Sequence, residues 1–152
     1  LLKLAGFTNH LRYVDIAHQA LAQMQPMMTQ YALGFGQWLQ ALAYTLAKPR
    51  EIAIVGDPES ADTKALLRIV RDGYRPFQAV ALGEPGIDDV QLARLRQLPS
   101  STDDKVVRIA AVPLLQDRGL IDGRAAAYVC RNFACQAPVT DPEALRTEVE
   151  HS

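Results

Sequence analysis

The chain has 152 residues, of which 49% are hydrophobic and 22% are charged, a composition typical of one globular domain or of a domain with part of another. Its 16 basic and 17 acidic residues leave a formal net charge of −1, which argues against a broad positive surface for nucleic acid. No apolar run approaches the roughly 18 residues of a membrane-spanning helix. We therefore expect a soluble protein without nucleic-acid or membrane partners.

The first third of the chain predicts helices. Residues 1–5 resemble the end of a helix that Gly6 terminates, and Thr8 or Asn9 then caps a second helix, which Pro26 interrupts. A third helix is expected from about Leu33 to Ala47. Both longer helices carry apolar residues at steps of three and four, namely Leu11, Val14, Ala17, Leu21 and Met24, then Phe35, Trp38, Leu39, Leu42, Ala43 and Leu46. A hairpin of two amphipathic helices cannot bury both apolar faces by itself, so we expect it to be covered by another part of a larger structure.

From residue 49 onward the pattern changes to a small α/β unit. The predicted strands are short apolar runs at Ile52–Val55, Gln78–Leu82 and Ala125–Cys130. The predicted helices are one from Ser60 or Asp62 with Ala65, Leu66, Ile69 and Val70 inward, one from Asp88 and Asp89, and one that a Thr140–Glu143 capping box opens toward Leu145 and Val149. Asp122 and Gly123 predict a turn, and Val106–Leu115 fits neither period. This order favours a three-stranded, mostly parallel sheet flanked by helices, which places the chain in the α/β class.

The ends of the predicted strands are one candidate site. In a parallel sheet the carboxyl ends of all strands share an edge, which would bring Gly56, Asp57, Gly83 and Arg131 together as a pocket. Gly56-Asp57-Pro58 before a helix is weakly similar to a phosphate loop but lacks both GxGxxG and GxxxxGK[ST]. Ordinary strand-to-loop exits are the interpretation that we favour.

The two cysteines are the other candidate site. Four residues separate Cys130 from Cys135, so the sulfurs can meet across a turn as a redox pair or reversible disulfide, and Arg131 would lower a thiol pKa. Two buried, reduced cysteines that pack are the alternative that we favour, in a cytoplasmic protein. The histidines are scattered and show no zinc-ligand spacing, so we expect no metal and no cofactor.

Three segments resemble one known family: Ala127–Pro142 around the cysteines, Arg50–Pro58, and Asp122–Arg124. The family is that of thioredoxin-domain-containing, spermatogenesis-associated-type proteins. The resemblance implies a longer parent with a thioredoxin-like domain and an α/α toroid similar to six-hairpin glycosidases. Residues 1–48 would then be the last helices of the toroid, and residues 49–152 a small C-terminal α/β domain. The CxxC motif of the thioredoxin-like domain has no match here, and no catalytic acid of a toroid maps onto this chain.

Three hypotheses about function follow. The first is a non-catalytic structural or interaction module that contacts the rest of its own parent chain or forms a homo-oligomer. The second is a contribution to a carbohydrate-active or thiol-redox enzyme site in the full-length protein. The third is a small-molecule or nucleotide-binding α/β domain that uses the loop at Gly56.

Overall fold

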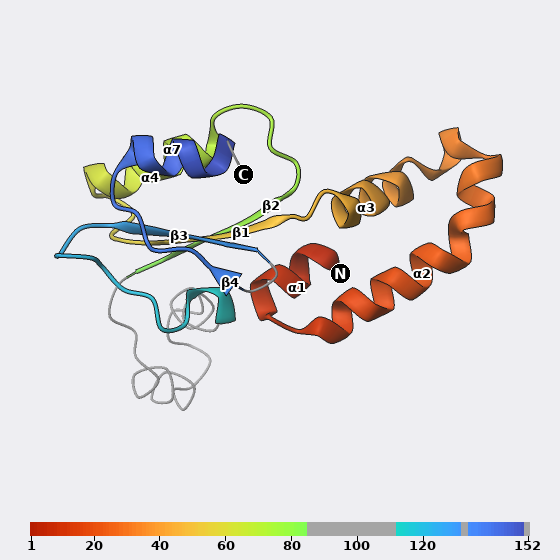
Figure 1. Cartoon of the computed structure of the whole chain (residues 1–152), viewed down its shortest axis with the longest axis horizontal. Helices are drawn as coiled ribbons and strands as arrows, with labels where there is room; N and C mark the ends of the chain where they lie inside the picture. Colours follow the sequence, from red (N-terminus) through yellow and green to blue (C-terminus); the bar gives the residue numbers. More distant parts are fainter. Residues whose placement is uncertain (85–111, 132–133, 151–152) are drawn as a thin grey trace, which may run out of the picture.

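The computed structural model describes residues 1–84, 112–131 and 134–150. A small sheet with helices on both faces forms one end of an elongated molecule, and a pair of helices projects from it as an arm (Figure 1). The helix expected from Asp88 and Asp89 lies outside the described residues.

The sheet has four strands in the order β2-β1-β3-β4. They are β1 (Arg50–Val55), β2 (Gln78–Gly83), β3 (Ala126–Arg131) and β4 (Ala134–Cys135). Strand β2 runs parallel to β1, as the β1–helix–β2 pattern predicts, whereas β3 runs antiparallel to β1. The prediction of a mostly parallel three-stranded sheet is therefore wrong in detail, since the sheet is mixed and has four strands. The reason is that β3 starts at the end of the sheet where β1 finishes, with Ala126 opposite Val55.

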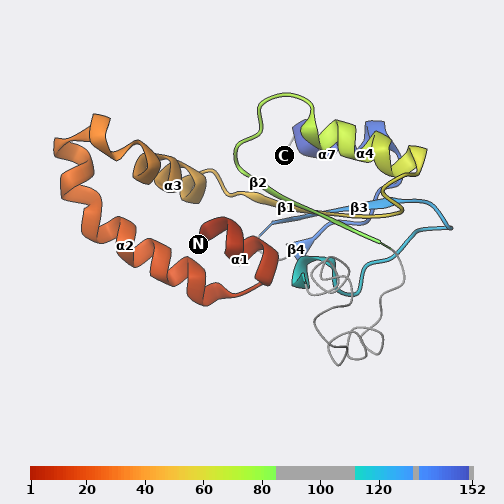
Figure 2. The same cartoon turned by 180° about the vertical axis from the view of Figure 1, so that it is seen from behind.

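One face of the sheet is covered by α4 (Ala61–Arg71) and α7 (Pro142–Glu150), which lie side by side (Figures 1 and 2). Strand β1 sends alternate side chains to this face, as its two-residue period requires. The residues that form this core are Ile52, Ile54, Leu66, Leu67, Ile69, Val70, Ala125, Ala127, Val129, Leu145 and Val149, all buried. The inward positions predicted for α4 at Leu66, Ile69 and Val70 are thereby confirmed, whereas Ala65 is only partly buried and lies outside this core.

The opposite face is covered by α1 (Leu2–Thr8) and the short 3₁₀ helix η2 (Pro113–Leu115). Ala53, Ala81 and Leu114 are buried there with Phe7 packed against them. Gly6 lies inside α1 and does not end it, contrary to the prediction. A side chain at Gly6 would come within 3.3 Å of Cγ of Glu51, so the glycine lets the helix approach the sheet closely.

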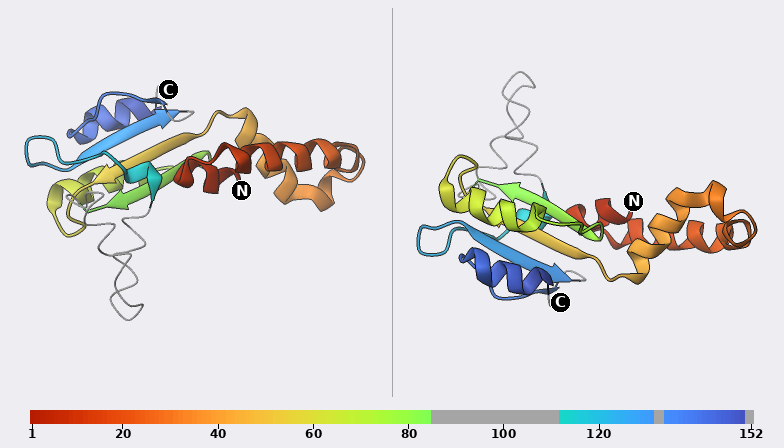
Figure 3. Two further views of the ribbon diagram at one scale, coloured as in Figure 1. Left: turned by 90° about the horizontal axis from the view of Figure 1, so that it is seen from below. Right: turned by 90° about the horizontal axis from the view of Figure 1, so that it is seen from above.

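The arm consists of α2 (Leu11–Gln30), η1 (Ala32–Phe35) and α3 (Gly36–Leu46), and it extends beyond the sheet (Figure 3). Helix α2 continues through Pro26, where the sequence predicts an interruption. Only Ala17, Leu21, Met28 and Tyr44 of α2 and α3 are buried. No helix in the described part of the chain is long and apolar enough to cross a bilayer.

Two local predictions have opposite outcomes. The Asp122-Gly123 turn is confirmed, because Ile121 and Arg124 exchange two backbone hydrogen bonds around it and both turn residues have positive φ. The N-terminus of α7 is capped by Asp141, whose Oδ2 accepts a hydrogen bond from the backbone N–H of Ala144 at 2.9 Å. Thr140 was expected in that role. Either residue type suits an N-cap, so the sequence pattern alone did not select Asp141.

Candidate functional site

The two cysteines lie on neighbouring strands beside the buried face that α1 covers. Cys130 of β3 is directly opposite Cys135 of β4, and their sulfurs form a disulfide with an S–S distance of 2.16 Å. Cys130 is 1% exposed, whereas Cys135 belongs to an exposed strand. The pairing differs from the two buried, reduced cysteines that we favoured, because β4 pairs with β3 in the register that places Cys135 directly opposite Cys130.

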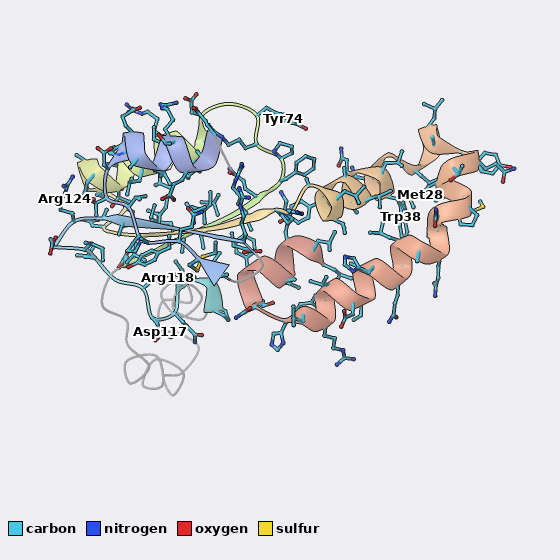
Figure 4. All side chains as sticks on the ribbon, viewed as in Figure 1. Met28, Trp38, Tyr74, Asp117, Arg118 and Arg124 are labelled. Carbon is cyan, nitrogen blue, oxygen red and sulfur yellow. A yellow bond between two sulfur atoms is a disulfide. The ribbon has the colours of Figure 1, made fainter. Side chains whose placement is uncertain are left out.

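Arg118 forms hydrogen bonds with both sulfurs. Its Nη2 donates to Sγ of Cys130 at 3.2 Å and to Sγ of Cys135 at 2.8 Å. Its guanidinium lies 5.5 Å from the ring centroid of Tyr128, within cation–π range. Figure 4 shows Arg118 on the β4 side of the sheet, with Asp117 pointing away from it.

Tyr128 holds the segment that carries Arg118. The tyrosine hydroxyl donates to the carbonyl of Gly119 at 2.9 Å and accepts from the N–H of Gly119 at 3.2 Å. Because these two bonds fix the residue next to Arg118, the guanidinium is positioned by the sheet itself. Burial lowers the pKa of Arg118, and the nearby Tyr128, Glu51 and Asp117 oppose that effect.

Glu51 supplies a carboxylate to the same site. It is 6% exposed and lies opposite Cys130 in the pairing of β1 with β3. Burial, followed by the charge of Glu51, raises the pKa of Tyr44 in α3 to about 12. Glu51 thus interacts electrostatically with both Tyr44 and Arg118, and it links the sheet to the helical arm.

This cluster has the components of a thiol site. A guanidinium in contact with sulfur favours the thiolate form, and a neighbouring carboxylate disfavours it. Within residues 1–84, 112–131 and 134–150 no group of three or more His, Cys, Asp or Glu side chains is arranged to hold a metal ion. The sequence pattern found the two cysteines. It did not find Arg118, because that arginine precedes them by 12 and 17 positions and no motif links the three.

The predicted strand-end pocket is not assembled as expected. Gly56 and Gly83 do lie together, since the N–H of Gly56 donates to the carbonyl of Gly83 at 2.9 Å. Asp57 follows them and accepts from the N–H of Glu59 at 2.9 Å, as in a turn. Arg131 lies at the other end of the sheet, opposite Arg50, because β3 runs antiparallel to β1.

Gly56 also has a structural role of its own. A Cβ there would lie 2.2 Å from Oγ1 of Thr63 and 2.7 Å from Cβ of Ala125. The space beside this glycine is therefore filled by α4 and by the residue that precedes β3. This supports the turn-and-packing interpretation of Gly56 over a phosphate loop.

The helical arm presents a second candidate surface. A groove runs between α2, α3 and the start of α1, and its apolar lining includes Leu2, Ala20, Leu21, Trp38, Leu39 and Phe77. Trp38 and Met28 lie where the two helices of the arm face each other (Figure 4). The groove is open to solvent and holds few charged side chains, so it suits protein packing better than polar catalysis.

Comparison with known proteins places the whole architecture within a longer sequence. The chain is 31% identical to Spermatogenesis-associated protein 20 of Homo sapiens over 146 residues, or 96% of this chain. The proteins of the same name from Rattus norvegicus and Mus musculus are each 30% identical over the same 96% of the chain. The chain spans only 16% of the length of these relatives. The similarity is consistent with the family that the cysteine segment indicates.

Neither a protein-family profile nor a solved structure matches the chain. A stretch similar to nearly all of it therefore occurs as about one sixth of a larger protein.

Proposed function

We propose that this chain is a structural and interaction module whose helical arm packs against other helices of a longer polypeptide. The observation that supports this most directly is the exposure of large apolar side chains along the arm, on α2, η1 and α3 and at Tyr31 between α2 and η1. These side chains, with their exposed fractions, are Leu11 62%, Ile16 40%, Met27 43%, Tyr31 54%, Leu33 103%, Leu39 37% and Leu46 73%.

The arm exposes more large apolar side chains than we expect of a surface that stays in contact with solvent. Single exposed leucines are ordinary, but the arm combines an apolar groove lined by Trp38, Leu39 and Leu21 with several further exposed apolar side chains. Helices that pack on one another bury such patches, and each fully buried leucine contributes about 1.5–3 kcal/mol. Within the described residues, α1 and the segment before β2 contact the arm, with Phe77 against Tyr44, but the apolar side chains named above remain exposed.

The proposed occupant of the groove is a helical region of the parent polypeptide outside residues 1–152. The relatives are about six times longer than the aligned stretch, which supplies such a region. The family resemblance makes it an α/α toroid, accompanied by a thioredoxin-like domain, with residues 1–48 as its last helices and residues 49–152 as the C-terminal domain. In this proposal the chain has no catalytic role of its own, and the parent protein is cytoplasmic.

Binding between the chain and the remaining polypeptide, expressed separately, tests the proposal. Wild-type chain should bind the remaining polypeptide as a one-to-one complex in isothermal titration calorimetry. Leu39→Ser, within the groove, should weaken the affinity about fivefold, because roughly 1 kcal/mol of apolar burial is lost. Leu120→Ser is the matched control, since Leu120 is exposed to nearly the same extent as Leu39, at 36%, and lies outside both the arm and the groove.

Each outcome of the binding experiment shows whether the groove is an interface and what occupies it. Equal affinities for both variants would remove the groove from the interface. Absence of binding by a folded, monomeric chain would contradict the proposal. A homodimer of the chain that Leu39→Ser dissociates would assign the groove to a second copy.

A further inference from the structure

We propose that Cys130 and Cys135 form a thiol–disulfide exchange site in which Arg118 stabilises the thiolate of Cys130. The inference is independent of the docking role of the arm, because the two features lie on different parts of the molecule. It depends on two contacts and one asymmetry: the 3.2 and 2.8 Å contacts of Arg118 with the two sulfurs, and the different exposure of those sulfurs.

The asymmetry decides which sulfur reacts. Cys135 lies on the exposed edge strand, whereas Cys130 is 1% exposed. An incoming thiolate can therefore reach Sγ of Cys135 and not Sγ of Cys130. The co-reactant is a dithiol, either a small molecule or a protein with two neighbouring cysteines.

Exchange then takes place in two balanced steps. A thiolate of the dithiol attacks Sγ of Cys135, a mixed disulfide forms, and the electron pair of the broken S–S bond leaves on Sγ of Cys130 as a thiolate. The second thiolate of the dithiol attacks its partner sulfur in the mixed disulfide and releases Cys135. The dithiol is oxidised to a disulfide, the protein disulfide gains two electrons, and both protein thiolates take protons from solvent according to their pKa values.

Arg118 acts on the leaving group. A cation in contact with sulfur lowers a thiol pKa by about 1–3 units, and a thiol of lower pKa leaves faster. The contact with Cys130 is partly buried and Tyr128 fixes the neighbouring residue, so the guanidinium is in place before reaction. Arg118 is thus the residue that we assign to thiolate stabilisation. Arg131, which was expected to lower the thiol pKa, lies on β3 opposite Arg50 and alternates to the other face of the sheet.

Other charged groups around the two cysteines also affect the thiolate of Cys130, either directly or through Arg118 and Glu51. Glu51 of β1 lies opposite Cys130 and opposes the thiolate. Asp117 and Tyr128 act on Arg118, and Tyr44 of α3 acts through Glu51. Lys3 of α1 is farther away, with its Nζ 6.0 Å from the ring centroid of Tyr44. Removing the positive charge of Arg118 should therefore raise the thiol pKa of Cys130, whereas removing the negative charge of Glu51 should lower it.

The first experiment measures the thiol pKa of Cys130 in the Cys135→Ser chain from the pH dependence of the ultraviolet absorbance of its thiolate, a readout that needs no reagent to reach the buried sulfur. Adding Arg118→Gln should move the profile up by about one pH unit, which lowers the thiolate fraction about tenfold below the pKa. Arg118→Lys should retain most of the wild-type profile, and Glu51→Gln should move it down. Arg124→Gln, on the distant hairpin turn (Figure 4), is the control and should change nothing.

The second experiment maps the mixed disulfide. The oxidised wild-type chain is exposed briefly to glutathione, quenched with acid, alkylated and analysed by mass spectrometry, and the adduct should lie on Cys135. Dithiothreitol should then reduce the same chain fully.

The result that would overturn the proposal is a pH profile that Arg118→Gln leaves unchanged in a variant that still unfolds cooperatively. An adduct on Cys130 would equally contradict it. So would a failure of the reduced chain to regain the disulfide in a glutathione redox buffer.

Discussion

Replacing Gly56 by alanine should destabilise the fold strongly, because no space for a methyl group exists at the end of β1. The added Cβ would lie 2.2 Å from Oγ1 of Thr63 and 2.7 Å from Cβ of Ala125. Neither neighbour is the mobile end of a long side chain. Thr63 is 0% exposed with a β-branched side chain, and Ala125 is 2% exposed next to β3.

The expected cost is about 3 kcal/mol, the upper end of the range for overpacked cores, because backbone must move. A displaced Ala125 also weakens its N–H bond to Asp62, which is 2.8 Å long. The assay is urea unfolding of the chain followed by circular dichroism. The matched control is Gly36→Ala, since nothing lies within 4 Å of a Cβ there and the backbone is helical. The control should be neutral or stabilising by about 0.5–1 kcal/mol. If Gly56→Ala unfolds within about 0.5 kcal/mol of wild type, the packing of β1 against α4 and Ala125 is refuted.

Three further predictions concern the electrostatics and the disulfide. Burial raises the pKa of Tyr44 to about 12. The neutral tyrosine therefore contributes fully to the free energy of unfolding below pH 10, and this contribution is lost between pH 10 and about 12. Tyr44→Phe should remove about 2 kcal/mol of the pH dependence of the unfolding free energy in this range, and an unchanged pH dependence would contradict the prediction. Hydrogen bonds from Ser60 and from the backbone lower the pKa of Asp62 to about 2, so its contribution is present above about pH 4 and is lost as the pH falls toward 2. Asp62→Ala should therefore lower the melting temperature at pH 7 and match wild type near pH 2, whereas a pH-independent difference would argue against the charge. Reducing the disulfide Cys130–Cys135, which closes a loop with a sequence separation of 5, should cost about 2 kcal/mol of unfolding free energy, and no change on adding dithiothreitol would show that the pair does not constrain the chain.

The parts of the fold that the sequence predicts are those with a local cause. Ile52–Val55 is a short apolar run and α4 repeats its apolar residues every three to four positions, so both elements are where the pattern indicates. The turn at Asp122 and Gly123 depends on two adjacent residues that tolerate positive φ. Each of these signals lies within a few residues of the structure that it specifies.

The direction of β3 has no such local signal. The apolar pattern of a strand does not indicate in which direction the strand runs in a sheet. The long connection after β2 permits both directions, so the prediction of a parallel sheet depended on element order alone. That order also misplaced Arg131, which the antiparallel strand carries to the opposite end of the sheet from Gly56. The wrong direction of this one strand explains why the residues of the predicted pocket do not lie together.

The charged part of the thiol site depends on tertiary contacts. Glu51 joins it because β1 pairs with β3, and Arg118 joins it because Gly119 is bonded to Tyr128. Neither pairing follows from the spacing of the cysteines. The domain boundary expected at residue 48 stays a prediction, although α1 packs directly on the sheet that follows it.

The most direct test of the docking role uses Trp38, the single tryptophan of the chain, which lines the groove of the arm. The chain is labelled with 5-fluorotryptophan and titrated with the unlabelled remaining polypeptide while its fluorine resonance is recorded. If the groove is buried by the partner, the fluorine resonance should shift and lose its sensitivity to exchange of H₂O for D₂O. A resonance that stays unchanged at saturating partner, in a chain that remains folded, would contradict the docking role.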